Sequence, residues 1–251
     1  MFFLAAFFFC RCQGQPVTEP VEHAGRDIFL LIGQSNMAGR AEIEEQDKDS
    51  LQRVFLFTGM VGREWEKAAN PLNRYSTVRK DLSMQKLGPG YTFAKKISEA
   101  YPGMEFGLVV NARGGTAISE WMPGKNLYNE AVKRAKQAMQ WGRIRGILWH
   151  QGESDVSRSA SYLEDLAILV QTLRTDLNAG SIPFVAGQLS EDRPERNALN
   201  KVLMQLPDRI NNCGIALSEG TATIDSTHFD SRSQRLMGER YAEEMIRLLG
   251  K

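Results

Sequence analysis

Short apolar runs that alternate with longer amphipathic segments constrain the fold of this chain more than any other feature. The apolar runs are rich in β-branched residues and are bounded by Gly, Asn or Pro, which is typical of buried strands. Between them, apolar residues recur at the i, i+3, i+4 spacing of helices. We expect strands at residues 27–32, 53–57, 106–111, 144–150, 184–186 and 214–218, and helices at 91–101, 126–141, 162–178, 198–210 and 234–249.

This alternation predicts one α/β domain: a three-layer α/β/α sandwich in which helices cover both faces of a mostly parallel sheet. A chain of 251 residues can bury the core of such a domain without disulfides or metal. The stretch 58–90 interrupts the alternation, because it is rich in Gly and Pro and has little periodicity. We expect it to form a binding loop at the carboxyl ends of the strands, where ligands bind in parallel sheets.

The amino-terminal segment is typical of a signal peptide. The first nine residues are apolar throughout, and a polar, Pro-containing stretch follows them. The run has no Lys or Arg at its start and no clear A-x-A cleavage site, so a buried strand or a truncated start is the alternative. We assign residues 1–20 to a signal peptide and linker, residues 21–251 to the folded domain, and the protein to a secreted or periplasmic location. The run is too short to span a membrane.

Charge and cysteine content narrow the classes of function. The formal net charge is +1, and basic and acidic residues are intermixed along the chain. Nucleic acid is therefore not an expected partner, because it requires a basic stripe, and a neutral substrate is favoured. Cys213 is the one cysteine beyond the leader, so no disulfide framework or C-x-x-C metal spacing is available there. Phosphate-binding glycine motifs are also missing, and we expect neither a metal nor a cofactor.

Ser35 is the first candidate for a chemical role. In residues 28–39 a buried strand stops at Gly33, and Ser35 follows two residues later with small residues after it. Such a strand-to-helix turn exposes a nucleophilic hydroxyl, and the start of the helix favours developing negative charge. The pattern differs from the G-x-S-x-G of α/β-hydrolases. A serine here can also simply cap a short helix.

A nucleophilic serine needs a base, and the chain offers His23, His150 and His228. His23 lies in the amino-terminal linker. His228 follows Asp225 by three residues, in a short loop ahead of the last helix. An aspartate at this spacing can reach Nδ1 of the imidazole and fix the tautomer, so that Nε2 faces the serine. An exposed polar turn would show the same residues.

Two further segments follow strands and are expected at the same edge of the sheet. Residues 111–116 contain Gly114 and Gly115, a turn whose N–H groups can face an oxyanion. Residues 149–154 contain Gln151, whose side-chain amide can donate a second hydrogen bond, and Glu153, a second carboxylate. His150 in the same segment can be a base, a substrate contact or a buried core histidine.

Taken in order, four motifs resemble those of the sialate O-acetylesterase and acetylxylan esterase group of the SGNH hydrolases. The resemblance covers nearly all of residues 26–249. It implies a flavodoxin-like α/β/α sandwich and hydrolysis of acetyl esters on glycans such as acetylxylan or O-acetyl sialic acid. The motifs are Gly33-Gln34-Ser35-Asn36-Met37, Gly114-Gly115-Thr116, His150-Gln151-Gly152-Glu153 and Asp225-x-x-His228.

The expected catalytic residues are Ser35 as nucleophile, His228 as base and Asp225 as the acid that orients the base. The N–H groups of Ser35 and Gly115 and the amide of Gln151 are expected to form the oxyanion hole. Gln151 takes the place of the asparagine that most SGNH enzymes use.

Three further assignments follow from the resemblance and from strand-end positions. Gln34 and His150 are expected to bind substrate, and Glu153 is the alternative acid for orienting His228. Two rival functions stay open: a lipase- or thioesterase-like SGNH esterase, and a catalytically silent glycan-binding protein on the same fold. The lipase-like alternative requires a long apolar groove, and the stretch 58–90 is instead rich in Arg, Asn, Gly and Tyr. The pattern names neither the sugar nor the oligomeric state.

Overall fold

The computed structural model describes residues 25–250, so the predicted signal peptide and linker at 1–20 lie outside the described residues. These residues contain a seven-stranded sheet in the order β3-β2-β4-β1-β5-β6-β7. All neighbouring strands pair in parallel except β2 and β3, which form an antiparallel hairpin. The strands are β1 (Arg26–Gly33), β2 (Val54–Met60), β3 (Arg63–Lys67), β4 (Phe106–Ala112), β5 (Gly142–His150), β6 (Phe184–Gly187) and β7 (Cys213–Ala216).

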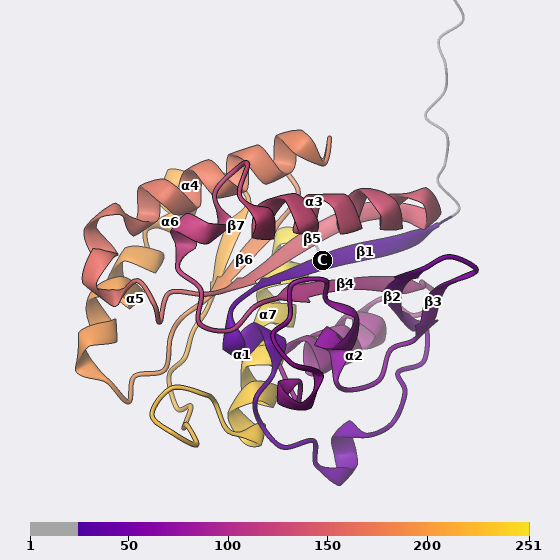
Figure 1. Cartoon of the computed structure of the whole chain (residues 1–251), viewed down its shortest axis with the longest axis horizontal. Helices are drawn as coiled ribbons and strands as arrows, with labels where there is room; N and C mark the ends of the chain where they lie inside the picture. The colour runs from indigo at the N-terminus through magenta and orange to yellow at the C-terminus, as the bar shows by residue number, and fades with distance from the viewer. Residues whose placement is uncertain (1–24, 251) are drawn as a thin grey trace, which may run out of the picture.

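Helices cover both faces of the sheet, which confirms the predicted three-layer sandwich (Figure 1). One face carries α3 (Asn126–Ala138), α4 (Ser159–Asp176), α5 (Asn197–Leu203) and α6 (Leu206–Arg209), and the other carries α2 (Gly90–Ala100) and α7 (Ser231–Leu248). A single turn, α1 (Ser35–Ala38), follows β1. Short 3₁₀ turns occupy Glu45–Asp47, Leu72–Tyr75, Leu82–Met84, Ile118–Trp121, Met139–Trp141, Val156–Arg158 and Pro194–Arg196. None of the helices within residues 25–250 is long and apolar enough to cross a membrane.

The central strand β1 is apolar on both sides because both sides are buried. Ile28, Leu30 and Ile32 point into a core shared with α3 and α4. Phe29 and Leu31 point the other way, into a core shared with α2 and α7. Successive side chains of a strand alternate between faces, so a strand covered on both faces reads as one continuous apolar run.

Two elements differ from the expectations. The 58–90 stretch contains the strand β3, whose residues Arg63–Lys67 are mostly charged and at most partly buried, so that no apolar run marks it. The expected helix at 198–210 is divided into α5 and α6. Pro207 lies in the first turn of α6, because proline lacks an N–H and does not fit inside a continuous helix.

The sheet creates a crevice at the carboxyl end of β1. β1 lies between β4 and β5, with β2 beyond β4 on one side and β6 and β7 beyond β5 on the other. The loops that leave β4 and β5 therefore diverge, and ligands bind at such a switch point in open α/β sheets. Gly33, the last residue of β1, pairs with Ala112 and His150, the last residues of β4 and β5. The motifs noted in the sequence thus reach the same edge.

Candidate active site

Ser35 lines a cavity of about 380 Å³ at the carboxyl end of β1. Gly33, where β1 ends, has a left-handed φ of 135°. A side chain at this position would collide with the carbonyl oxygen of His150, so only glycine allows β1 to turn here. Ser35 is then the first residue of α1, and it is only 5% exposed. The turn presents its hydroxyl to the cavity.

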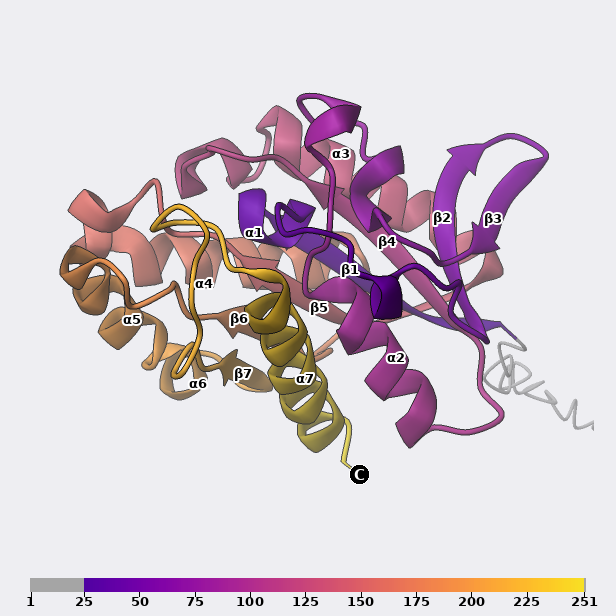
Figure 2. The ribbon, with the colours of Figure 1, turned by 90° about the horizontal axis from the view of Figure 1, so that it is seen from below.

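His228 and Asp225 complete a hydrogen-bonded chain with Ser35. Nε2 of His228 lies 3.0 Å from Oγ of Ser35, and Nδ1 lies 2.6 Å from Oδ2 of Asp225. The other oxygen of Asp225 accepts the main-chain N–H groups of Thr227 and His228, at 3.0 and 2.8 Å. Figure 2 shows this segment, just ahead of α7, beside α1. The structure therefore brings together the three side chains expected from the sequence.

The pKa of Asp225 is lowered from its ordinary value. Partial burial raises this pKa, but the hydrogen bonds from the main chain and imidazole of His228 and from the N–H of Thr227 outweigh burial. The carboxylate stays ionised and holds a proton on Nδ1. The Nε2 atom is then free to accept the proton of the serine hydroxyl.

Glu153 does not contact His228. Its Oε1 atom accepts a hydrogen bond from Nδ2 of Asn36 at 2.7 Å. The same Nδ2 donates to the carbonyl oxygen of Thr227 at 3.1 Å, and Oδ1 of Asn36 accepts the N–H of Phe229 at 3.1 Å. Glu153 is thus connected to the histidine loop through Asn36, a residue to which the sequence analysis gave no role.

His150 lies behind the cavity, within the core. It is 1% exposed, and its Nδ1 lies 2.9 Å from the hydroxyl of Tyr241, which itself donates to the carbonyl oxygen of Trp149. Nδ1 therefore carries the proton, and Nε2 faces Oε1 of Glu153 at 3.8 Å. Burial lowers the pKa of His150, opposed by the charge of Glu153. The structure thus places His150 in the core and not among the residues that line the cavity, which differs from the expected contact with substrate.

Gln151 is also placed differently from the expectation. It is fully buried, does not line the cavity, and donates its amide hydrogens to the carbonyl oxygen of Thr116 at 2.8 Å and to Asp155 at 2.6 Å. It therefore has no donor to offer an oxyanion. Its Nε2 also lies 3.2 Å from Oε1 of Gln34, which receives the N–H of Gly152 at 3.4 Å. Gln34 lines the cavity, and its own amide nitrogen is the end that these contacts leave available.

Ser35 and Gly115 also contribute main-chain N–H groups to this region of the molecule. Both residues line the cavity, and no acceptor among residues 25–250 takes either N–H group. Gly115 has a left-handed φ of 70°. A side chain at Gly114 would meet the guanidinium of Arg40 and the Cβ atom of Ser35. The two glycines thus let the chain after β4 approach the serine closely.

Four cationic side chains line the cavity, in addition to the residues that the sequence indicated. They are Arg40, Lys80, Arg193 and Arg196, and they accompany a single lining carboxylate, Glu153. Arg193 and Arg196 share one segment, whereas Arg40 and Lys80 come from two others, and no spacing in the sequence connects the three segments. The nearly neutral net charge of the chain concealed this local excess.

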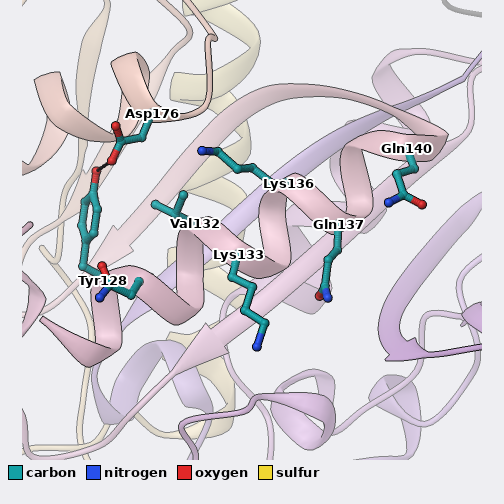
Figure 3. A pocket seen from close by; sticks show the side chains of 8 residues that line it. Tyr128, Val132, Lys133, Lys136, Gln137, Gln140 and Asp176 are labelled. Carbon is teal, nitrogen blue, oxygen red and sulfur yellow. Dashed lines mark hydrogen bonds between the residues drawn. The ribbon is translucent and has the colours of Figure 1, made fainter. Parts of the chain in front are cut away.

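A second hollow, of about 500 Å³, lies along α3 (Figure 3). Tyr128 on α3 donates a hydrogen bond to Asp176 at the end of α4, at 2.6 Å, and Lys133 and Lys136 also line the hollow. Neither the Ser35 turn nor the His228 loop borders it. Within the described residues, no three His, Cys, Asp or Glu side chains are grouped in a way that could hold a metal ion.

Comparisons with known proteins identify relatives of this chain. The chain is 35% identical over 182 residues to a probable carbohydrate esterase of Arabidopsis thaliana, which is 63% of this chain and 66% of that protein. The X-ray structure of this Arabidopsis protein matches with a TM-score of 0.80 and 27% identity, over 89% of this chain and 98% of that one.

A carbohydrate acetylesterase from Xanthomonas citri shares the fold, with a TM-score of 0.64 and 22% identity, over 87% of this chain and 55% of that one. Residues 25–247 match the model of a family described as carbohydrate esterase, sialic acid-specific acetylesterase. Because this match spans nearly the whole chain, the protein belongs to that carbohydrate esterase family.

Proposed function

We propose that this protein is a carbohydrate O-acetylesterase that works through an acetyl-serine intermediate. The observation that carries the proposal is the hydrogen-bonded chain from Asp225 through His228 to Ser35, which ends in an open cavity. Membership of a carbohydrate esterase family supports an ester of a sugar as the substrate class.

In the first half of the reaction, Oγ of Ser35 attacks the acetyl carbonyl carbon while Nε2 of His228 takes the hydroxyl proton. Asp225 holds the imidazole in the required tautomer and stabilises the imidazolium that forms. The bond between the acetyl carbon and the sugar oxygen then breaks as His228 returns the proton to the leaving sugar hydroxyl. The products of this half are a free sugar hydroxyl and an acetyl-serine.

In the second half, a water molecule takes the place of the sugar. His228 removes one of its protons, and the oxygen attacks the acetyl-serine carbonyl. The bond to Oγ of Ser35 breaks, and His228 protonates this oxygen, which releases acetate and restores the enzyme. The same base therefore serves both halves.

The oxyanion formed in each half needs donors that point into the cavity. We assign this role to the N–H groups of Ser35 and Gly115 and to the side-chain amide of Gln34. A donor of this kind contributes about 10²–10³-fold to the rate. Gln151 supports the arrangement from behind, because its contact with Oε1 of Gln34 leaves the nitrogen end of that amide for the cavity.

The cavity favours a short acyl group over a lipase-like activity. Its volume is about 380 Å³, and most of its lining side chains are charged or polar, so it offers no extended apolar surface for an acyl chain. A silent glycan-binding protein would not require the aligned serine, histidine and aspartate. Covalent labelling of Ser35 by a fluorophosphonate separates that alternative from an esterase.

The test of the proposal is acetate release from acetylated xylan, from simple acetylated sugars and from O-acetyl sialic acid. A parallel series of aryl esters measures acyl selectivity. We expect kcat/KM to fall at least tenfold, on the order of 1.4 kcal/mol, between the acetyl and the octanoyl ester. Comparable values for both esters would place the protein with lipase-like enzymes, and failure to release acetate from any sugar would overturn the proposal.

A further inference from the structure

Asp155 is a fully buried acid that does not line the Ser35 cavity. It lies in the turn after β5, where its main-chain N–H donates to the carbonyl oxygen of Gly152 at 2.8 Å. Its own carbonyl oxygen accepts the N–H of Arg158 at 2.7 Å. Burying a carboxylate is costly unless hydrogen bonds compensate for the lost water, so the contacts of this side chain indicate what it does.

One oxygen of Asp155 joins two segments that come from different strands. Oδ2 accepts the side-chain amide of Gln151 at 2.6 Å and the main-chain N–H of Ile118 at 2.8 Å. Gln151 follows β5, whereas Ile118 lies in the loop that leaves β4. Oδ1 forms no hydrogen bond within residues 25–250, and it lies 3.9 Å from Nη1 of Arg158. The side chain is therefore mainly a link between the two loops.

This link reaches the oxyanion donors from both sides. The loop after β4 carries Gly115, and the amide of Gln151 donates to the carbonyl oxygen of the next residue, Thr116, at 2.8 Å. On the side of β1, the same Nε2 atom of Gln151 lies 3.2 Å from Oε1 of Gln34. Asp155 therefore holds the residue that spaces the amide of Gln34 from the N–H of Gly115.

We propose that Asp155 is a positioning residue for the oxyanion hole. It contacts neither the substrate nor the reacting atoms, and it keeps Gln34 and Gly115 at the spacing that a tetrahedral oxyanion requires. Oxyanion donors are most effective when they are fixed before the charge develops, because no reorganisation is then needed during the reaction. The inference rests on the proposed function, since it requires Gln34 and Gly115 to be the donors.

The first test separates the oxyanion from the bound substrate. Asp155→Ala removes both hydrogen bonds of Oδ2, so kcat on an aryl acetate should fall about 10²-fold, the cost of a small misplacement at an active site. KM should stay nearly unchanged, because the interaction is made in the transition state. Rates are expressed per active site, counted by fluorophosphonate labelling of Ser35, so that a loss of folded protein does not contribute.

Phenylboronic acid supplies a readout that a merely structural role would not move. Its boron atom bonds to Oγ of Ser35 and becomes tetrahedral, with an oxygen at the position of the oxyanion. Such a transition-state analogue reports the donors directly. Asp155→Ala should therefore weaken its affinity by the same factor, about 10²-fold, as it lowers kcat.

A conservative variant and a matched control complete the series. Asp155→Asn keeps an oxygen for both donors, but a neutral oxygen binds them less strongly, so kcat and boronate affinity should both fall by up to about tenfold. The control is Asp176→Asn, the same substitution in the hollow along α3, where Asp176 accepts the hydroxyl of Tyr128 at 2.6 Å (Figure 3). It should keep the wild-type kcat and boronate affinity.

The outcomes separate the positioning role from the esterase itself. Wild-type kcat for Asp155→Ala would overturn the positioning role and leave the esterase proposal standing. A loss of kcat with unchanged boronate affinity would do the same, because the effect would then lie outside the oxyanion hole. If the alanine variant does not fold, the paired loss in Asp155→Asn decides between these results. If no sugar ester releases acetate and Ser35 resists the fluorophosphonate, the proposed function itself fails.

Discussion

The nucleophile and its base are held in very different ways. Ser35 follows the central strand β1, which pairs with β4 and β5, and it is 5% exposed. Asp225 and His228 lie in the segment between β7 and α7, and their side chains are 50% and 24% exposed. The sheet therefore places the serine, whereas a surface loop places the acid and the base.

Side-chain hydrogen bonds attach the loop that carries Asp225 and His228 to the rest of the site. Asn36, the neighbour of Ser35, donates to the carbonyl oxygen of Thr227, and Arg196 donates to the hydroxyl of the same residue at 3.1 Å. The 3.0 Å contact between Ser35 and His228 therefore depends on bonds outside the seven-stranded sheet.

The largest effect is expected from Ser35→Ala. Loss of the nucleophile should reduce kcat on an aryl acetate by a factor on the order of 10⁶. The hydrolysis that remains is the part that substrate binding and oxyanion stabilisation still accelerate. The fold should persist, because the sheet and not the hydroxyl positions this turn, and circular dichroism with thermal melting checks this. A variant that keeps more than a small residue of wild-type turnover would show that another group attacks the ester.

The next largest effect compares the two carboxylates. Asp225→Asn should lower kcat about 10⁴-fold, because the amide no longer fixes the tautomer of His228 or stabilises the imidazolium. Glu153→Gln should lose far less activity, because Glu153 reaches the loop only through Asn36. Both variants are measured on one acetyl ester at one pH, with folding checked. Equal losses would indicate shared duty, and the reverse order would transfer the orienting role to Glu153.

A smaller effect is expected when the tether between the two sides is removed. Asn36→Ala deletes the donor to Thr227 and Glu153 and the acceptor for Phe229, so the histidine loop should shift. A small misplacement of a catalytic group can cost about 10²-fold in rate, which sets the expected loss of kcat. Fluorophosphonate labelling should be slowed but not abolished.

The matched control for this tether is Asn129→Ala, which removes one exposed hydrogen bond to Gly124 and does not touch the residues that line the Ser35 cavity. It should leave kcat unchanged. If Asn36→Ala also keeps the kcat of the wild-type protein, the loop holds its position without this tether.

The smallest effect concerns stability against pH. Burial lowers the pKa of His150 in the folded protein, below the value of 6.5 that applies to an unfolded chain. As pH falls below 6.5, the unfolded chain binds a proton that the folded protein does not bind, so the free energy of unfolding decreases. The slope from this group reaches at most about 1.4 kcal/mol per pH unit. It ends once the pH is below the folded-state pKa.

Urea unfolding from neutral to mildly acidic pH measures this slope. His150→Gln should be less stable at neutral pH, because it loses the contacts to Tyr241 and Phe229. Its stability should nevertheless fall less steeply with acid than that of the wild-type protein. Parallel curves for the two proteins would show that His150 does not contribute to acid sensitivity.

The strands that carry the site were predictable, because burial on both faces produces continuous apolar runs. The Ser35 turn and the Asp225–His228 loop were also predictable, because each is formed by residues that lie close together in the sequence. β3 was not predictable in this way, because the antiparallel edge strand Arg63–Lys67 has charged residues and no apolar run.

Side-chain direction at a strand end was the main source of error. Whether His150 and Gln151 face the cavity or the core depends on the turn that follows β5, and residue spacing carries no record of that turn. Contacts between distant segments were also hidden. Asn36 bonds to residues more than a hundred positions away, and Arg40 and Lys80 line the same cavity because both lie beside the Gly114–Gly115 turn.

One carboxylate oxygen of Asp225 binds the imidazole of His228. The other oxygen accepts two main-chain N–H groups of the same turn. These contacts hold acid, base and turn together as one unit, and its joint with the nucleophile consists of the Ser35–His228 contact and the two hydrogen bonds of Asn36 to this loop. Motion of this unit changes the distance from Ser35 to His228 and leaves the geometry between His228 and Asp225 intact. Warming should open this joint before the sheet melts, so that activity declines reversibly at temperatures where the rest of the molecule is still folded.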